Sequence, residues 1–308
     1  MEQRGIFTKG GDRGGTERSP RAAATVILLR DRADALYEFL LMRRGRNQAF
    51  MGGAFVFPGG SLDESDLNPE LAACVAGFSA TDAKRLLQEN DLPEAVAFGL
   101  FMAAIRETFE ESGVLLARGE RGGRFNPAAS ETAARLDACR RELHERRLTL
   151  AELAHRENLL FAPDLLIPYA HWITPEIEGR RFDARFFLAL LPEGQIPVHD
   201  RMELTESRWL DSATALAEHA AGRIVLMPPT LKTVEELLGF SDTESLFSAA
   251  RARQIRSIFP NFFQAKDGFG IRLPTDSEYT PATLRQPPRP GESTRIVFEG
   301  GIWKSHTV

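Results

Sequence analysis

The alternation of apolar and polar residues predicts a small sheet near the start of the chain. Residues 24–29 form a short apolar run typical of a strand, and residues 36–42 follow as its hairpin partner. Residues 54–57 predict a third strand, which the Pro-Gly-Gly segment at 58–60 ends as a turn. Because glycine has no Cβ, a ligand can approach the backbone of this turn closely.

Most of the remaining chain has the residue spacing of helices. Leucine and alanine recur at intervals of three and four residues, and Ser79 and Thr81 are candidate N-caps. The predicted helices cover residues 83–90, 93–112, 129–146, 149–156, 213–221, 230–238 and 244–259. Strands are predicted at 165–173 and 185–191, and in the Pro-rich tail after Gln264 only residues 295–298 are typical of a strand.

Composition excludes several classes of protein. The 308 residues are 43% hydrophobic and 26% charged, as expected for a globular protein of one or two domains. The formal net charge of −5 argues against a dedicated nucleic-acid binder. No apolar run approaches the roughly 18 to 20 residues of a membrane helix, and residues 1–21 lack the apolar core of a signal peptide. We therefore expect a cytoplasmic protein without nucleic-acid or membrane partners. Cys74 and Cys139 are expected to be unreactive thiols.

Three glutamates in the predicted helix over 93–112 are the strongest indication of chemistry. Glu107, Glu110 and Glu111 stand at positions i, i+3 and i+4, so their carboxylates emerge on one face. Like charges near the C-terminal end of a helix repel one another and the helix dipole. A solvated acidic face is the commoner meaning of this spacing alone. Mg²⁺ or Mn²⁺, which prefer oxygen ligands, would neutralise the cluster, and the glycines at 58–60 offer backbone groups for a metal or phosphate.

The same residues resemble the Nudix box, whose pattern is G-x5-E-x7-R-E-U-x-E-E-x-G-U. Gly60 and Asp66 correspond to its first half and residues 106–114 (RETFEESGV) to its second, with Asp66 in place of Glu and Thr108 at the apolar position. Between Asp66 and Arg106 lie 39 residues where the pattern has seven, so 32 extra residues interrupt the box. The subgroup of the peroxisomal coenzyme A diphosphatase Nudix 19 also carries a long insertion there. The chain is similar to this subgroup again at residues 171–175, 181–187 and 206–210.

The resemblance covers about residues 22–240 and implies the fold. We expect an α/β protein, specifically an α/β/α sandwich with a mixed sheet, enlarged by helical insertions. A disordered arm over 1–20 would precede a Nudix hydrolase domain over 21–245, with insertions near 67–98 and 118–160. A C-terminal extension over 246–308 would pack on the same domain.

The resemblance also implies a metal-dependent hydrolase. Its expected ligands for Mg²⁺ or Mn²⁺ are Glu107, Glu110, Glu111 and the carbonyl of Gly59. Arg106 would reach back to the glycine loop and orient a carboxylate, whereas a plain i,i+4 pair with Glu110 is the simpler alternative. The expected reaction is attack of a metal-activated water on the diphosphate of a nucleoside diphosphate linked to another moiety. The general base is expected in the box, at Glu107 or Glu110. Outside the box the candidates are Glu203 and Glu206, which are alternatively polar loop residues before a strand.

The substrate is less well defined. Nudix enzymes that cleave coenzyme A often carry the motif L-L-T-x-R-[S/A]-x3-R-x3-G-x3-F-P-G-G, and this chain matches it only in part. Arg44, Phe57 and Gly60 match and are the candidate substrate-binding residues, although Arg44 could belong to an exposed basic turn. Coenzyme A or an acyl-CoA is therefore the leading substrate, and ADP-ribose or a dinucleotide is the alternative. A non-catalytic Nudix-like binding module, a helical interaction protein with a chance box, and a homodimeric state all stay open.

Overall fold

The computed structural model describes residues 19–308 except 34–35, 46–50, 120–129, 201–202 and 266–267. The predicted arm over 1–20 lies outside the described residues apart from its last two. No helix in the described part of the chain is both long and apolar enough to cross a membrane.

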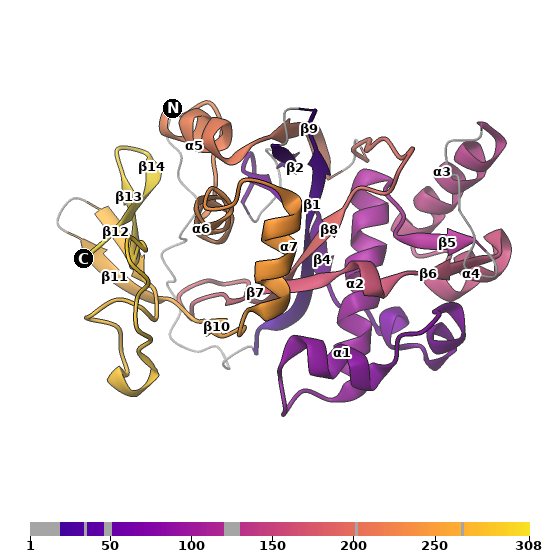
Figure 1. The fold of residues 1–308 in the computed structure, drawn as a ribbon, viewed down its shortest axis with the longest axis horizontal. Coiled ribbons are helices and arrows are strands. Elements are labelled where there is room, and N and C mark those ends of the chain that lie inside the picture. Colours follow the sequence, from indigo (N-terminus) through magenta and orange to yellow (C-terminus); the bar gives the residue numbers. More distant parts are fainter. Residues whose placement is uncertain (1–18, 34–35, 46–50, 120–129, 201–202, 266–267) are drawn as a thin grey trace.

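An eight-stranded mixed sheet forms the centre of the molecule (Figure 1). Its strands follow the order β10-β7-β8-β1-β2-β3, while β4 pairs with β1 and β9 pairs with β2. The predicted hairpin of the first two strands is confirmed, with Leu29 opposite Phe39. β1 also runs parallel to β8 from Arg21 opposite Phe182 to Leu29 opposite Leu190. The strands are β1 (Arg21–Asp31), β2 (Tyr37–Arg44), β3 (Phe55–Val56), β4 (Gly59–Ser61), β7 (Ile167–Ile173), β8 (Phe182–Leu190), β9 (Leu204–Leu210) and β10 (Ser257–Ile258).

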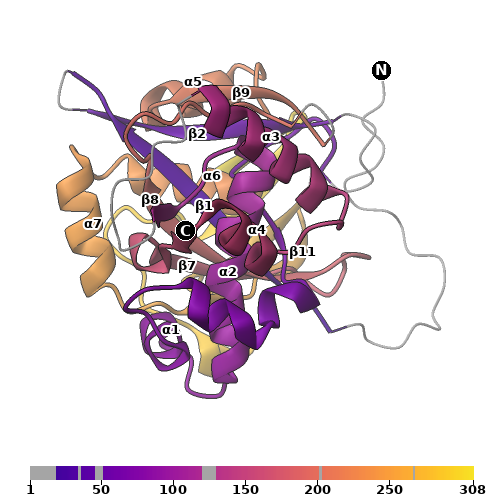
Figure 2. The same ribbon diagram turned by 90° about the vertical axis from the view of Figure 1, so that its right-hand side faces the viewer.

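Helices cover both faces of this sheet, as Figures 1 and 2 show from two directions. They are α1 (Ala80–Leu87), α2 (Glu94–Ser112), α3 (Ser130–His144), α4 (Leu150–Glu157), α5 (Ser212–Ala220), α6 (Pro228–Leu237) and α7 (Thr243–Ala252). Alternate residues of β1 face opposite sides, so Val26 packs with α2 and Ile27 packs with α6 and α7. The expected α/β sandwich with a mixed sheet is therefore confirmed.

The short elements belong to the helical segments around α2. They are the 3-10 helices η1 (Glu64–Leu67), η2 (Pro69–Cys74) and η4 (Pro163–Leu165), and the two-stranded sheet of β5 (Ala117–Gly119) and β6 (Leu159–Phe161). Both cysteines are free and buried, and burial raises the pKa of each thiol, as expected of unreactive side chains.

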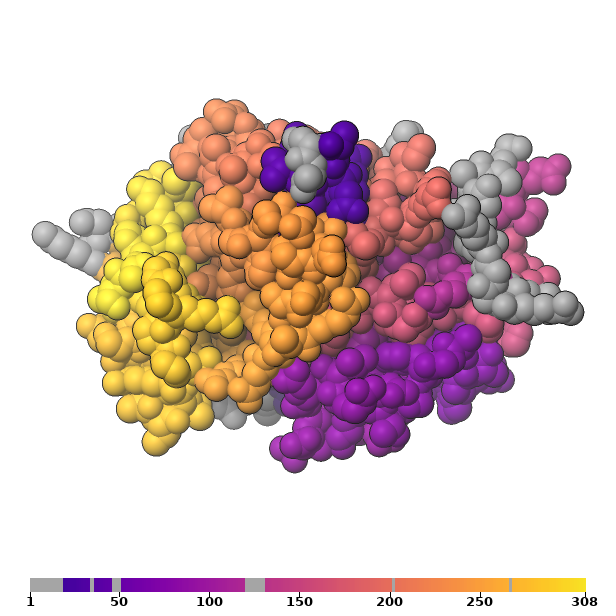
Figure 3. Space-filling view, viewed as in Figure 1, coloured from indigo at the N-terminus to yellow at the C-terminus, as the bar shows by residue number. Residues whose placement is uncertain are grey.

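The structure corrects the prediction for the C-terminal tail, where a single strand was expected. Four antiparallel strands lie there, β11 (Asn261–Ala265), β12 (Gly268–Arg272), β13 (Arg295–Glu299) and β14 (Ile302–His306). Glycines in these strands hide the alternation of apolar and polar side chains that would predict a sheet. A Cβ at Gly270 would lie 2.8 Å from the Ile296 carbonyl oxygen, so this strand needs glycine to pair closely with its neighbour. Trp303 and Ile271 join the core cluster that contains Ile27. Figure 3 shows this C-terminal segment lying directly against α7.

Two other predictions and one alternative differ from the structure. The Pro-Gly-Gly segment does not end the sheet as a turn, because Gly59–Ser61 pair with β1 as strand β4. The last predicted helix ends at Ala252 and not at residue 259. Glu206 lies within strand β9 and not in a loop before it.

Candidate active site

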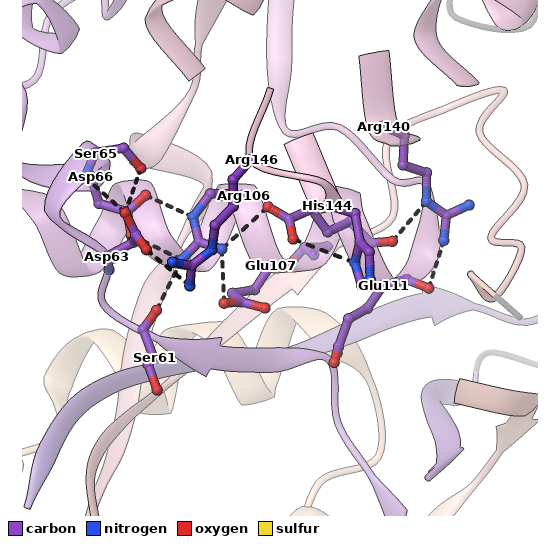
Figure 4. A network of polar contacts seen from close by, with 12 residues as sticks. Ser61, Asp63, Ser65, Asp66, Arg106, Glu107, Glu111, Arg140, His144 and Arg146 are labelled. Carbon is purple, nitrogen blue, oxygen red and sulfur yellow. Dashed lines mark hydrogen bonds and ion pairs between the residues drawn. The ribbon is translucent and has the colours of Figure 1, made fainter. Parts of the chain in front are cut away.

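Arg106 joins the two halves of the interrupted motif. Its Nε and Nη2 donate to the two carboxylate oxygens of Asp66 at 2.8 and 2.9 Å, and Nη2 also donates to the Ser61 carbonyl at 2.9 Å. Its Nη1 donates to Glu107 at 2.8 Å and to Glu110 at 3.2 Å (Figure 4). All five N–H groups of the guanidinium are thus used. The contact with the loop and the i,i+4 pair with Glu110 are both present.

The shorter acid at position 66 reaches Arg106 because a 3-10 turn carries it inward. Asp66 ends a capping box in which the Asp63 backbone N–H donates to its carboxylate at 2.8 Å, while Asp63 accepts from the Ser65 backbone N–H at 3.0 Å. Only 1% of the Asp66 surface is exposed. The acid is therefore buried and satisfied by three donated hydrogen bonds, two of them from a charged group.

The backbone of Gly59 faces α2 and not the neighbouring strand. The Val26 N–H donates to the Pro58 carbonyl at 2.8 Å, so the next pair in this antiparallel ladder, Thr25 and Gly59, exchanges no hydrogen bonds. The N–H of Gly59 donates instead to Glu111 Oε2 at 2.8 Å. Because the N–H and C=O of one strand residue point to the same side, the Gly59 carbonyl also faces this part of the site.

Gly60 leaves room for a glutamate. A Cβ at this position would lie 2.4 Å from the carboxyl carbon of Glu107, so the Glu107 side chain rests directly on the backbone of β4. Any larger residue would displace that carboxylate.

Burial makes the carboxylate cluster electrostatically unfavourable. It raises the pKa of Glu107 to about 7, and it raises the pKa values of Glu110 and Glu111 as well. Glu107 and Glu203 raise the pKa of Glu111 further by repulsion, and the N–H of Gly59 opposes them. The cluster is therefore short of positive charge.

Oxygen donors short of positive charge fit the chemistry of a hard divalent cation. Within the described residues, however, no three acidic, histidine or cysteine side chains already converge as a ligand set. Glu107 and Glu110 point to Arg106, while Glu111 points to the N–H of Gly59. The donor chemistry fits a metal ion, and the carboxylates would turn toward it on binding.

Two residues of α3 complete the site, and the motif does not reveal them. Arg140 donates through Nε to the Glu110 carbonyl at 2.8 Å and through Nη2 to the Glu111 carbonyl at 2.7 Å, so it caps the C-terminal end of α2. His144 Nδ1 lies 3.9 Å from Glu110 Oε2. Their i,i+4 spacing on the helix that follows the box is the only sequence feature that could have indicated them.

A cavity of about 1040 Å³ opens beside the carboxylates. The three glutamates of the box line it together with Arg44, Phe57, Gly59, Gly60 and Glu203. Glu206 is not among the lining residues, and its Oε2 faces Arg43 Nη1 at 3.5 Å. The Nε of Arg44 is buried without a hydrogen-bond partner in the described structure. The far wall is apolar and includes Trp172, Ile271 and Trp303.

Comparisons with known proteins place the chain among Nudix proteins. The family described as the NUDT19 Nudix domain matches residues 75–237. The acyl-coenzyme A diphosphatase NUDT19 of Homo sapiens is 31% identical over 277 residues, covering 79% of this chain and 72% of the human protein. Its counterpart in Xenopus laevis is 26% identical over 289 residues, covering 85% of this chain and 75% of the Xenopus protein. The crystal structure of a NUDIX hydrolase from Alicyclobacillus acidocaldarius superposes with a TM-score of 0.55 at 26% identity, covering 76% of this chain and 97% of that one.

Proposed function

Because this chain belongs to the Nudix hydrolase family, in the group defined by the NUDT19 Nudix domain, we propose that it hydrolyses the diphosphate of coenzyme A or an acyl-CoA with the help of Mg²⁺ or Mn²⁺. It is a pyrophosphohydrolase, and Nudix hydrolases generally use divalent metals. The observation that carries the proposal is the position of the three glutamates at the edge of a large cavity, where Arg106 holds Glu107 and Glu110 and the Gly59 N–H holds Glu111. The names of the relatives supply the choice of coenzyme A.

In the proposed reaction, water attacks one phosphorus of the diphosphate. A P–O bond forms to the water oxygen, and the bond from that phosphorus to the bridging oxygen breaks. The bridging oxygen leaves with its electron pair on the other phosphate, and the water proton passes to a carboxylate. The products from coenzyme A are 3′,5′-ADP and 4′-phosphopantetheine.

The residues of the box would have separate roles in this reaction. Glu107, Glu110, Glu111 and the Gly59 carbonyl would hold the metal ion, which when bound would acidify water and neutralise phosphate charge. Glu107 or Glu110 would accept the proton, since both line the cavity and both are held by Arg106. Glu203 is the outside candidate for this role, because it lines the cavity and Glu206 does not.

Substrate binding would fall to residues next to the carboxylates. The buried Nε of Arg44 has no protein partner in the described structure and lies close enough to lower the pKa of Glu111 by attraction. It is therefore suited to bind a phosphate oxygen. Phe57 is 3% exposed and packs edge-on against Phe39, so it would form the floor beneath the substrate.

The test is a substrate screen with purified protein. Coenzyme A, a series of acyl-CoA esters, ADP-ribose and a dinucleotide are incubated with Mg²⁺ or Mn²⁺, and products are separated by chromatography. We expect release of 3′,5′-ADP from coenzyme A, and none after addition of a chelator or in the E110Q variant. Brisk cleavage of ADP-ribose without cleavage of coenzyme A would overturn the choice of substrate. Cytoplasmic location and a homodimeric state stay predictions, which cell fractionation and light scattering would test.

A further inference from the structure

Arg21 and Arg180 line the cavity from neighbouring segments of the backbone. Arg21 begins β1 opposite Phe182 of β8, and its backbone N–H donates to the Arg181 carbonyl at 3.0 Å. Phe182, Ala184 and Phe186 of β8 all line the cavity, as does Arg180 two positions earlier. Arg21, Ala23 and Thr25 line it from β1. Arg21 therefore shares the cavity-facing side of the sheet with Phe182, its partner in β8, while Arg180 lines the same cavity from the bend that precedes β8.

The register of β1 sets the distance of these arginines from the expected reaction centre. Thr25 lies opposite Gly59, whose N–H binds Glu111, so it marks the carboxylate end of the cavity. Arg21 precedes Thr25 by four residues, which corresponds to about 13 Å along the strand. A ligand that spans the cavity could therefore place its diphosphate at one end and a second group near Arg21.

Neither guanidinium has a partner among the residues that the structure describes. No hydrogen bond or ion pair of the Arg21 or Arg180 side chain is present there. Arg181, which follows Arg180 in the chain, is different: its Nε donates to the Thr174 carbonyl at 3.1 Å and its guanidinium lies 5.8 Å over the Phe259 ring.

The nearby acid does not neutralise this pair either. Glu178 also lines the cavity, and burial alone raises its pKa to about 7, with no cation opposing the shift. Two neighbouring guanidinium groups without an acid repel each other, and an anion between them reverses the sign of that interaction. A phosphate monoester suits the position because it carries close to two negative charges at pH 7 and accepts several hydrogen bonds.

We propose that Arg21 and Arg180 bind a phosphate monoester of the substrate that is separate from the diphosphate under attack. This inference rests on the proposed function, and on coenzyme A the group is the 3′-phosphate of the adenosine. The pair would make the enzyme select substrates that carry this phosphate. ADP-ribose and 3′-dephospho-CoA lack it.

The first test measures binding without catalysis. Metal-free protein is titrated with 3′,5′-ADP and with AMP, which differ by the 3′-phosphate, in wild type and in the R21Q, R180Q and R21Q/R180Q variants. We expect wild type to bind 3′,5′-ADP about tenfold more tightly than AMP, a preference worth about 1.4 kcal/mol. This preference should vanish in the double variant and shrink with added salt. Melting curves check that each variant is folded, and the single variants serve if the double one is not.

The second test uses turnover. The ratio of kcat/KM for coenzyme A to that for 3′-dephospho-CoA should fall about tenfold in R21Q/R180Q, while turnover of 3′-dephospho-CoA is unchanged. R146Q is the matched control, because Arg146 also lines the cavity but its Nη2 already lies 3.4 Å from an acid, at Asp63 Oδ2. It should leave the ratio unaltered.

The two tests separate this inference from the proposed function. A double variant that keeps the wild-type preference in both assays, or an equal loss in R146Q, would overturn the phosphate site. If wild type failed to cleave coenzyme A yet preferred 3′,5′-ADP through Arg21 and Arg180, the proposed substrate would be wrong and the phosphate site would stand.

Discussion

Replacing Asp66 by asparagine should destabilise the protein, because this carboxylate is the buried partner of Arg106. Asp66 is 1% exposed and receives both Nε and Nη2 of Arg106 within 2.9 Å. An asparagine side chain keeps one acceptor oxygen and turns an NH₂ group toward the second donor. Removing one partner of a buried ion pair costs about 3–5 kcal/mol. Glu107 and Glu110 still compensate the arginine, so we expect the lower end, about 3 kcal/mol.

The assay is urea denaturation followed by fluorescence, together with melting curves. A loss of about 3 kcal/mol corresponds to a Tm lower by about 5 °C for a chain of 308 residues, because the unfolding entropy is about 2.1 cal/mol/K per residue. D66E restores the acid of the Nudix pattern and keeps both charged hydrogen bonds, so it should lose only about 1–2 kcal/mol through the extra methylene group. D137N is the control, since Asp137 pairs with Arg141 on the exposed face of α3 and such surface pairs contribute about 0–1 kcal/mol.

The reasoning would be refuted if D66N lost no more stability than D137N. That result would mean that the loop and α2 are held together by apolar packing, with the guanidinium network contributing nothing measurable. A larger loss in D66E than in D66N would also contradict it, because size and not charge would then decide.

Three further predictions concern other parts of the structure. E111Q should lose most metal-dependent turnover, and full activity would exclude Glu111 as a metal ligand. The Tm of this variant should not fall, because burial already disfavours the ionised carboxylate of Glu111. G60A should lower kcat with little change in the urea midpoint, because the new Cβ displaces the flexible end of Glu107 from a position 2.4 Å away; unchanged kcat would show that this position is unimportant. Burial alone would raise the pKa of Asp276, but the ion pair with Arg295 holds this pKa below its usual value of 3.8. The stability that this pair contributes is therefore present above about pH 4 and disappears as the pH falls further. D276N should therefore differ from wild type in urea denaturation at pH 7, and the difference should shrink as the pH is lowered below about 4. A constant difference would contradict this assignment.

Elements with a regular side-chain pattern can be predicted from the sequence. The pattern predicts a helix over 93–112, and α2 spans Glu94–Ser112, because Gly113 ends it in the left-handed conformation with φ of 73° and an N–H bonded to the Phe109 carbonyl. The three glutamates share one face of this helix as its period requires. The common face of these three glutamates therefore follows from residue spacing alone, whereas their chemistry does not.

Elements whose pairing depends on the backbone could not be predicted. β4 has the sequence Gly-Gly-Ser, which has no apolar pattern, and only its register with β1 makes it a strand. The C-terminal sheet is concealed in the same way by Gly268 and Gly270. α7 ends early because Gln88, far away in the chain, donates to the Arg253 carbonyl at 2.9 Å and accepts from the Ile255 N–H at 3.1 Å.

The site was predictable in its residues and not in its contacts. Spacing placed Arg106 beside Glu110, but whether it reached Asp66 depended on the 3-10 turn that follows Asp63. Arg140 contacts the end of α2 from α3, and Arg21 and Arg180 line the cavity from other segments. Contacts between distant segments are set by packing, which a single sequence does not display.

The interruption of the box has a consequence for how such motifs tolerate change. Lengthening the connection from seven to 39 residues raises the entropy lost on closing it by about 1.5 kcal/mol, since this entropy grows only with the logarithm of length. Leu71 and Leu87 of the added segment are buried in the same core as α2, so the segment contributes stability of its own. A fixed spacing between Gly60 and Arg106 is therefore not needed to bring Asp66 and Arg106 together. An insertion between Asp66 and Arg106 therefore costs little stability, provided that these two residues still form their ion pair.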